Sequence, residues 1–374
     1  MSGNKSDTFF ECLFIKKVVA LIAENWRISF RMKDVQNRFK TALDDTVKEW
    51  KNHEKVKGIF VYGSFAKGTA TADSDLDISI IWDADEAPVR LMSTHKEVRI
   101  DMVFMTIGEI EEVLGRTTTD VFRVSEVVNR FRSSRIIHDP KGMLKKWQKS
   151  AMEYSWPSGT ISGMKNAALE FLSRAKNFAD EKDYASAIYE MREGLFQFGR
   201  LILMSNNIFT VLRPAEVLTE IRMLDPMTYQ LFLRTYKLRG LDEPKLLIIL
   251  EELRTWIERA EERLGNSEDI GQTTQATRLL AQAQRQYHGS LNLTYGGDYE
   301  LAALEMREAA SMLGKAMVVL RGESSPEKTG FIASLRESEA EFFNQILVEY
   351  GAYDIQPAEI SRIINEVEFL AHRT

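Results

Sequence analysis

The most informative stretch of this chain runs Gly63-Ser64-Phe65-Ala66-Lys67-Gly68-Thr69-Ala70-Thr71-Ala72-Asp73-Ser74-Asp75-Leu76-Asp77. It places a Gly-Ser turn a short distance before an Asp-x-Asp pair. The preceding residues 56–62 are apolar and β-rich, so they predict a buried strand that ends in this turn. Glycine permits unusual dihedral angles and close backbone approach. The exposed N–H groups of such a turn, with the Ser64 hydroxyl, can cradle a phosphate.

The Asp-x-Asp pair opens a second predicted strand, at residues 76–82. Because successive side chains of a strand point to opposite faces, Asp75 and Asp77 share one face. A third apolar strand is expected at residues 97–105, with Asp101 in its middle. If the second and third strands pair, three carboxylates converge. Magnesium suits such a site, because it takes oxygen ligands and shares its shell with substrate phosphates.

Two such ions, about 3.5–4 Å apart, can stabilise the attacking and leaving oxygens of an in-line displacement. In this interpretation Asp75 and Asp77 hold the metal-bound triphosphate, while Asp101 holds the second metal and takes the proton of an acceptor hydroxyl. A lone Asp-x-Asp usually marks a solvated strand start, and a lone Gly-Ser is a turn. The joint order of strand, turn, gap and two acidic strands favours a catalytic site over a degenerate copy of one.

The run Gly-Ser-x-x-Lys-Gly-x5-Ser-Asp-x-Asp resembles the signature of the DNA polymerase β-like nucleotidyltransferase superfamily, whose small members include the kanamycin-type and minimal nucleotidyltransferases. The resemblance covers residues 56–105 and, at the level of fold, extends to about residue 150. It implies ATP or another nucleoside triphosphate as substrate and two magnesium ions held by the three aspartates. The nucleotide-binding residues that it implies are Gly63, Ser64, Lys67 and Ser74.

One position departs from the pattern of the small family members. They usually have Arg where this chain has Lys67. Lysine keeps the positive charge but loses the bidentate geometry with which arginine binds phosphate. The role of position 67 therefore stays open.

Composition places the chain in a broad class. Its 374 residues exceed one ordinary core, so two or three domains are expected. Apolar and charged contents of 44% and 28% are typical of a soluble globular protein. A single cysteine, Cys12, excludes an intrachain disulfide, which fits a cytoplasmic location. The apolar stretch at residues 9–22 is interrupted by charges, so an amphipathic helix is expected there and no membrane span.

Charge is distributed unevenly along the chain. The whole chain carries −6, which argues weakly against a general nucleic-acid binder, but residues 1–150 carry +3 and the remainder −9. A local basic cluster follows the catalytic motif. A solvated helix face explains it most simply, and contact with a polyanion is the alternative. The cluster consists of Arg130, Arg132, Arg135, Lys141, Lys145, Lys146 and Lys149.

Helical patterns surround the strands and fill the second half of the chain. Trp156-Pro157-Ser158-Gly159 suggests a domain boundary. The predicted fold class is α+β: a small mixed nucleotidyltransferase sheet flanked by helices, then two tandem all-helical units. The expected domains are 1–155, 156–265 and 266–374. Helices of the first domain are expected at 8–24, 33–52, 107–115, 119–133 and 142–154.

An internal repeat supports the tandem arrangement. Asp183-Tyr-Ala-Ser-Ala-Ile-Tyr-Glu190-Met-Arg-Glu193 matches Asp298-Tyr-Glu-Leu-Ala-Ala-Leu-Glu305-Met-Arg-Glu308 at a constant offset of 115 residues. Chance similarity of two amphipathic helices is the alternative. The Asp-Tyr-x-x-Ala start resembles helical bundles of the HEPN or kanamycin-nucleotidyltransferase type. HEPN ribonucleases carry an Arg followed by a His at a spacing that no histidine of the helical half satisfies.

The helical units are therefore expected to build an acceptor pocket, a homodimer interface or a protein-docking surface. Glu190 and Glu193 could act as an auxiliary base, but a solvated or ion-paired helix face is favoured. Met191 and Met306 are expected in the core.

The leading hypothesis is a magnesium-dependent transfer of a nucleoside monophosphate, AMP from ATP, to a hydroxyl with release of pyrophosphate. The acceptor is a small molecule, a protein side chain or an RNA end. A regulatory protein whose helical units dock a partner is the second hypothesis. A catalytically idle scaffold is the third, and three clustered carboxylates that repel one another argue against it.

Overall fold

The computed structural model describes residues 35–71, 74–267, 269–322 and 330–374. The expected helix at residues 8–24 and Cys12 lie outside the described residues. The chain divides into two compact units, Met1–Tyr154 and Ser155–Thr374. Within the described part of the chain, no helix is long and apolar enough to cross a membrane.

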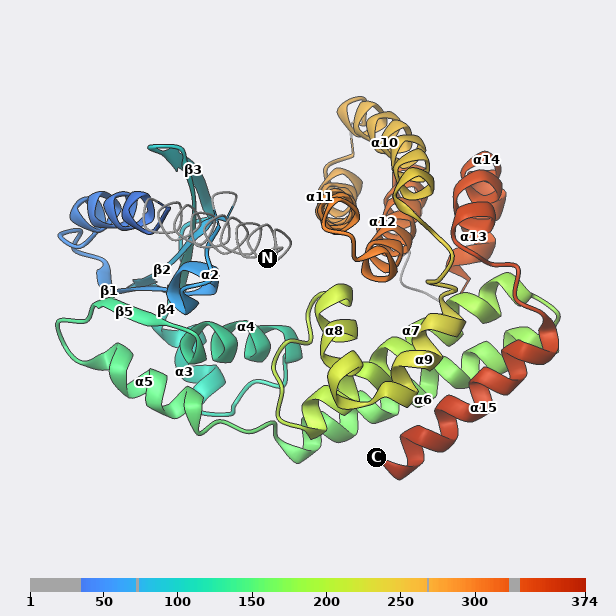
Figure 1. Ribbon diagram of the computed structural model, residues 1–374, viewed down its shortest axis with the longest axis horizontal. Coiled ribbons are helices and arrows are strands. Elements are labelled where there is room, and N and C mark those ends of the chain that lie inside the picture. The colour runs from blue at the N-terminus through green and yellow to red at the C-terminus, as the bar shows by residue number, and fades with distance from the viewer. Residues whose placement is uncertain (1–34, 72–73, 268, 323–329) are drawn as a thin grey trace, which may run out of the picture. The chain divides into compact units, whose positions relative to one another are not determined.

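The first unit is built on a five-stranded mixed sheet with the strand order β3-β4-β2-β1-β5 (Figure 1). Strands β2 and β4 are parallel, and the other neighbours are antiparallel. The sheet confirms the three predicted strands and adds β3 and β5, neither of which was predicted. The strands are β1 (Val56–Val61), β2 (Leu76–Trp82), β3 (Leu91–His95), β4 (Val98–Thr106) and β5 (Arg135–His138).

Helices cover both faces of this sheet. The helix over residues 35–50 packs Phe39 and Leu43 into one core with Ile59 and Ile78. On the opposite face the Phe60 ring lies 4.8 Å from that of Phe131. The other helices in the described part of this unit are α2 (Gly63–Lys67), α3 (Ile107–Leu114), α4 (Val121–Arg132) and α5 (Met143–Met152). Because strand side chains alternate, Asp77 and Asp101 point to the face that α4 covers.

Local sequence sets where these helices begin. Thr106 accepts a hydrogen bond from the Glu109 N–H, and Glu109 returns one to the Thr106 N–H, which makes a capping box at the start of α3. Asp120 caps α4 in a similar way. On the same face as α4, Gly58 lets Leu144 of α5 approach the sheet, since a Cβ at Gly58 would lie 2.8 Å from the Leu144 Cδ1.

The second unit consists of helices, and the repeat extends through all of it. Helices α7 (Tyr184–Ser205) and α12 (Tyr299–Leu320) begin at the offset of 115 residues, and the helices around them follow in the same order. The first repeat contains α6 (Ser158–Asp180), α7, α8 (Pro214–Leu224), α9 (Pro226–Thr235) and α10 (Glu243–Gly265). The second contains α11 (Ile270–Tyr295), α12, α13 (Phe331–Ser338), α14 (Ala340–Phe342), the π-helix η1 (Phe343–Tyr350) and α15 (Pro357–Arg373).

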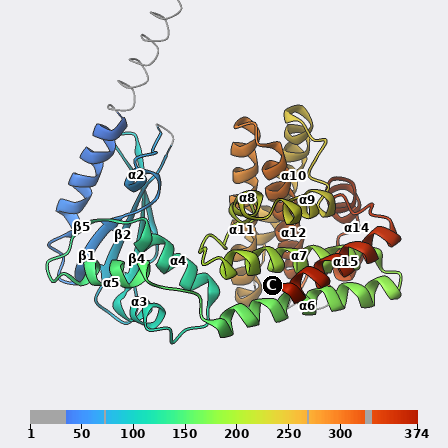
Figure 2. The same ribbon diagram turned by 60° about the horizontal axis from the view of Figure 1, so that its bottom comes forward.

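Each repeat forms a helical hairpin, α6 with α7 and α11 with α12, and gives its last helix to the other repeat. Helix α10 packs on α11 and α12, whereas α15 packs on α6 and α7 (Figures 1 and 2). The expected domain boundary near residue 265 stays a prediction. Each repeat completes its core with a helix from the other repeat.

Candidate nucleotidyl-transfer site

The sheet brings the predicted aspartates to neighbouring positions. Since β2 and β4 are parallel and in register, Asp77 and Asp101 are direct cross-strand partners. Adjacent strands lie about 4.8 Å apart, so the two side chains stand side by side on one face. Asp75 precedes β2 on that same face. Asp101 is 4% exposed, while Asp75 and Asp77 are partly exposed.

The predicted glycine turn packs directly against this pair. Gly63 has a φ of 70°, a conformation that L side chains rarely adopt. A Cβ at this position would overlap the Asp77 carboxylate. The Tyr62 N–H also donates to the Asp77 carbonyl at 3.1 Å. Glycine is therefore required here both by the backbone angle and by the closeness of the carboxylate.

The remaining predicted nucleotide-binding residues lie on or beside α2. Ser64 stands in the first turn of this helix, where backbone N–H groups have no intrahelical acceptor. Lys67 is exposed in its last turn. Ser74 holds the connection to β2, because its hydroxyl accepts a 2.9 Å hydrogen bond from the Thr71 N–H.

Two arginines that sequence reasoning did not select bind the aspartates. Arg90 forms a bidentate ion pair with Asp101, and its Nε lies 2.5 Å from Oδ1. The Nε of Arg99 lies 2.7 Å from Oδ1 of Asp75. The sequence could have indicated Arg99, because strand alternation puts Arg99 and Asp101 on one face. Nothing in the sequence indicated Arg90, because its position depends on strand β3, which was not predicted.

Asp77 differs from its two neighbours. Within the described residues, no hydrogen bond or ion pair to its carboxylate is found. Burial, followed by the nearby charges of Asp101 and Asp75, raises its pKa to about 6. Burial likewise raises the pKa of the Tyr62 hydroxyl to about 12, and Asp77 and Asp101 add to the shift. Asp75 and Asp101 are each paired with an arginine, whereas the Asp77 carboxylate has no direct counter-ion among the described residues.

The donor set can be compared with what magnesium requires. In the described part of the chain, no group of three or more His, Cys, Asp or Glu side chains is arranged as a metal centre, and arginines occupy two of the three carboxylates. The chemistry nevertheless fits: the oxygens are hard donors, and Asp77 has a pKa raised by burial and then by its two neighbouring carboxylates, which a bound cation would lower. Asp75, Asp77 and Asp101 would hold such an ion once Arg99 and Arg90 release them.

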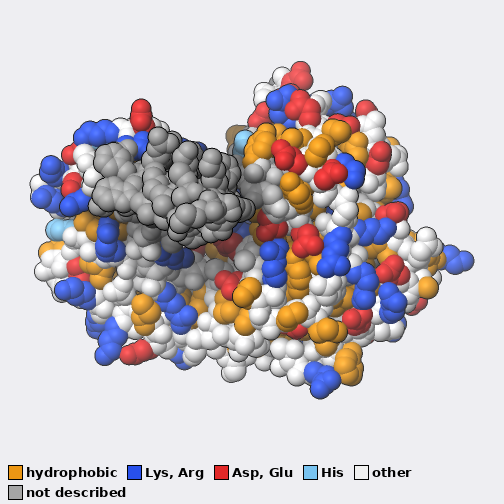
Figure 3. Space-filling model, viewed as in Figure 1, with side chains coloured by type: hydrophobic (Ala, Val, Ile, Leu, Met, Phe, Trp, Pro, Cys, Tyr) orange, Lys and Arg blue, Asp and Glu red, His pale blue; other side chains and the backbone are white. Residues whose placement is uncertain are grey.

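The basic cluster that follows the motif does not act as one patch. Arg132 donates to the Ala151 and Tyr154 carbonyls, so it has a structural role. Arg130 pairs with Glu126 at 2.6 Å and lies over the Tyr62 ring, beside the site. The lysines of α5 are exposed on the side away from its buried Trp147. On the face shown in Figure 3, basic side chains are interspersed with acidic and apolar ones.

The glutamates of the helical repeat are explained by their contacts within the second unit. Glu190 is buried and accepts a 2.9 Å hydrogen bond from the Nε of Arg174. Its counterpart Glu305 accepts from the Ala215 N–H at 2.9 Å. The ion-paired alternative for Glu190 is therefore confirmed. Met191 and Met306 are in the core, as predicted.

Comparison with known proteins agrees with this geometry. The family model described as Polymerase beta, Nucleotidyltransferase matches residues 45–134. No curated protein matches the chain. A solved nucleotidyltransferase-like protein from Exiguobacterium sibiricum 255-15 is similar over 81% of this chain and 89% of its own, at 14% identity and a TM-score of 0.35. A TM-score this low does not establish a shared fold.

The family match begins before β1 and ends with α4, so it contains the glycine turn and all three aspartates. It does not reach the helical repeats, whose resemblance to HEPN bundles stays a prediction. The expected fold class, α+β with a mixed sheet followed by helices, is confirmed. Residues 45–134 of this chain form a nucleotidyltransferase domain of the polymerase β family.

Proposed function

We propose that the protein is a magnesium-dependent nucleotidyltransferase that transfers a nucleoside monophosphate, AMP from ATP, to an acceptor hydroxyl and releases pyrophosphate. The acceptor oxygen forms a bond to the α-phosphorus, and the bond from that phosphorus to the bridging oxygen of the pyrophosphate breaks. The observation that carries this proposal is the packing of the Gly63 turn against Asp77, with Asp101 beside it on the next strand. A phosphate-binding turn and a pair of carboxylates thus meet at one point.

Each residue has a proposed role. Asp75 and Asp77 hold the ion that accompanies the triphosphate, and the turn at Gly63 and Ser64 binds its phosphates. Asp101 holds the second ion and receives the proton of the acceptor hydroxyl. When bound, magnesium neutralises the phosphate oxygens at both ends of the displacement. Arg90 and Arg99 must leave their carboxylates as the ions bind, and their guanidinium groups then become available to phosphate oxygens.

The acceptor is proposed from charge. The second unit lies within the acidic part of the chain, which favours a small cationic acceptor of the aminoglycoside kind in the cytoplasm. An RNA end has less support, because Arg132 and Arg130 in the basic cluster are engaged within the first unit. The helical repeats are proposed to supply an acceptor pocket, a docking surface for a protein or a homodimer interface.

The test is pyrophosphate release with each of the four ribonucleoside triphosphates, magnesium, and panels of aminoglycosides, RNA and protein extract. The variant with Asp75→Ala and Asp77→Ala serves as the inactive form. Release that requires both aspartates and one acceptor class supports the proposal and names the acceptor. Nucleotide binding without release by any acceptor would replace it with a regulatory role, in which the domain senses nucleotide and the helices dock a partner.

A further inference from the structure

The helical repeats contain a pair of equivalent arginines with different surroundings. Arg192 of α7 is buried and donates to three backbone carbonyls, at Thr235, Gly351 and Ala352, over 2.7–3.2 Å. Arg307 of α12 occupies the same place in the second repeat, 115 residues later. Its Nε has one long bond of 3.4 Å, to the Tyr350 carbonyl, the equivalent of Thr235. Its Nη1 is buried without a hydrogen-bond partner among the described residues.

The exchanged helices that pack against the two hairpins also differ. Three isoleucines of α15, at positions 360, 363 and 364, are no more than 2% exposed. The equivalent positions of α10 are Lys245, which is exposed, Ile248, which is 59% exposed, and Ile249. The α15 positions are therefore packed into the core in the half that contains Arg192. In the half that contains Arg307, by contrast, α10 leaves Ile248 and Lys245 exposed.

The open half contains a cleft of about 330 Å³ between α10 and the end of η1. Ile248, Ile249 and Leu241 give it apolar walls, and Lys245 and Glu349 are exposed charges in its lining. Arg307 also lines this cleft, and it lines the small hollow behind it as well. Clefts of roughly 300–1,000 Å³ with apolar walls and a few polar groups are typical of small-molecule sites. The helix beside it is a π-helix, whereas its counterpart α9 is an ordinary α-helix, and π-turns are frequent at functional sites.

The charge of Arg307 is poorly compensated. It is 7% exposed. Burial and the nearby charge of Arg192 lower its pKa to about 9, and Asp354 opposes the shift without cancelling it. A buried guanidinium with a free N–H and a depressed pKa gains from an anion, because a charge-assisted hydrogen bond would satisfy both its charge and its donor.

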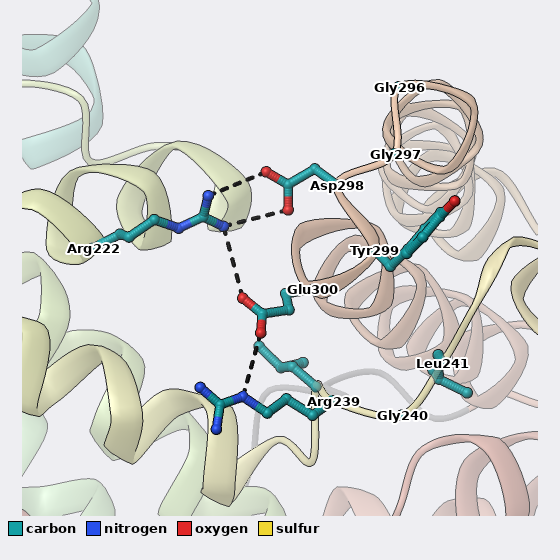
Figure 4. Close-up of a pocket in the computed structure, with 10 residues that line it drawn as sticks. Arg222, Arg239, Gly240, Leu241, Gly296, Gly297, Asp298, Tyr299 and Glu300 are labelled. Atoms are coloured by element: carbon teal, nitrogen blue, oxygen red, sulfur yellow. Dashed lines mark hydrogen bonds and ion pairs between the residues drawn. The ribbon is translucent and has the colours of Figure 1, made fainter.

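A larger cavity in the same unit, of about 560 Å³, shows the opposite situation (Figure 4). There the guanidinium of Arg222 lies 3.3 Å from Asp298, and that of Arg239 lies 3.4 Å from Glu300. Its two arginines and two carboxylates balance in charge, although the Nε of Arg222 is buried without a hydrogen-bond partner among the described residues. The cleft beside Arg307 is therefore the stronger candidate.

We propose that the cleft between α10 and η1 binds a small amphipathic anion, with a carboxylate or phosphate head on the Arg307 guanidinium and an apolar body along Ile248, Ile249 and Leu241. Lys245 adds little to this attraction, because its ammonium group lies 3.4 Å from the Asp242 carboxylate. This site lies wholly within the second unit, and it does not depend on the nucleotidyl-transfer proposal.

The test uses the full chain with octanoate and octyl phosphate as probes, and with octanol and octylamine as the uncharged and cationic controls. Isothermal titration and thermal shift should both report binding of the anions in the millimolar range or tighter. Arg307→Met should weaken binding at least tenfold. Ile248→Glu, on an exposed side chain, should weaken it several-fold by repulsion without affecting the fold. Ile270→Glu, on another exposed isoleucine outside the cleft, should leave it unchanged.

Three results would each overturn the proposal. Octanol could bind as tightly as octanoate, which would show that the anionic head contributes nothing. Ile248→Glu could bind like the wild type, which would place the anion elsewhere. The anions could also give no heat and no thermal shift with a folded wild-type protein. A circular dichroism melt of each variant separates lost binding from lost structure.

Discussion

Asp77 in the sheet and Glu308 in the helical repeat are both carboxylates whose pKa is raised first by burial and then by a neighbouring carboxylate. The pKa of Asp77 rises to about 6, and that of Glu308 is also raised, by burial and by the nearby Glu193. At neutral pH a pKa of about 6 leaves Asp77 mostly charged. The difference between the two regions teaches that a raised pKa alone does not mark a functional carboxylate, and that the surroundings of the carboxylate must distinguish the two.

The environments agree with this distinction. Asp77 lies beside a glycine turn, next to Asp101 and within reach of solvent. Glu308 follows Arg307 on α12 and lines a small hollow with Glu193, Arg192 and Tyr236. That hollow has a volume of about 20 Å³, which is room for one or two waters and not for a nucleotide. The same kind of residue thus lies beside a glycine turn within reach of solvent in one region and in a closed hollow in the other.

The largest expected effect is that of Asp77→Asn on transfer activity. If this variant stays active, the contrast between Asp77 and Glu308 is wrong. In the proposed mechanism Asp77 is a metal ligand, and the loss of such a ligand removes several kcal/mol of transition-state stabilisation, so transfer should fall by about 10³-fold or more. The metal-free protein should become more stable at pH 7, by about 1–2 kcal/mol, because the penalty of ionising a carboxyl with a raised pKa disappears. Pyrophosphate release and urea unfolding measure the two effects.

The sign follows from linkage. The folded protein keeps a proton on Asp77 between pH 3.8 and about 6, where the unfolded chain has lost it, so stability falls as pH rises through that window. The variant should lack this slope. Asp85→Asn, at an exposed loop position, should change neither activity nor slope. A destabilised Asp77→Asn protein would contradict the electrostatic account of the site.

The site on the sheet could be predicted from the sequence, because its residues lie close together in the chain or follow the alternation of a strand. The Gly63 turn and the Asp75–Asp77 pair lie in one stretch, and alternation places Asp101 on their face. Arg90 could not be found, because it precedes β3, whose side chains are nearly all exposed and give no alternation. The repeat was visible as identical residues 115 positions apart. The exchange of α10 and α15 was not, because the partner of an amphipathic helix is set by tertiary packing.

The second prediction uses the two equivalent arginines. Arg192→Met leaves two buried carbonyls and one half-buried carbonyl without their donor. Each buried one costs about 1–3 kcal/mol, so unfolding should require at least about 2 kcal/mol less. Arg307→Met removes one long bond and a poorly compensated buried cation, so its stability should change by less than about 1 kcal/mol. Urea denaturation of both variants compares them. If the two variants lose the same free energy of unfolding, the two arginines contribute equally to stability and the predicted difference is wrong.

The third prediction separates backbone strain from contact with the carboxylate. Gly63→Ala combines a left-handed φ of 70° with overlap on Asp77, whereas Gly142→Ala has a φ of 69° and no atom within 4 Å of its Cβ. Each should lose about 1 kcal/mol to strain. Only Gly63→Ala should also lose activity, by about 10–100-fold, because a displacement near 1 Å at a reacting site is that costly. An equally inactive Gly142→Ala protein would show that strain alone explains the loss.

The smallest expected effect concerns the pH dependence of the helical unit. Since burial, followed by the nearby Glu193, raises the pKa of Glu308 above its ordinary value of 4.5, the folded protein retains a proton that the unfolded chain has released, and stability declines as pH rises above 4.5. From pH 7 to 9 the decline should amount to about 1 kcal/mol. Glu308→Gln, which keeps a hydrogen-bonding amide and cannot ionise, should flatten this part of the profile. Glu349→Gln, on an exposed side chain, should not. A profile that stays sloped in Glu308→Gln would contradict this account.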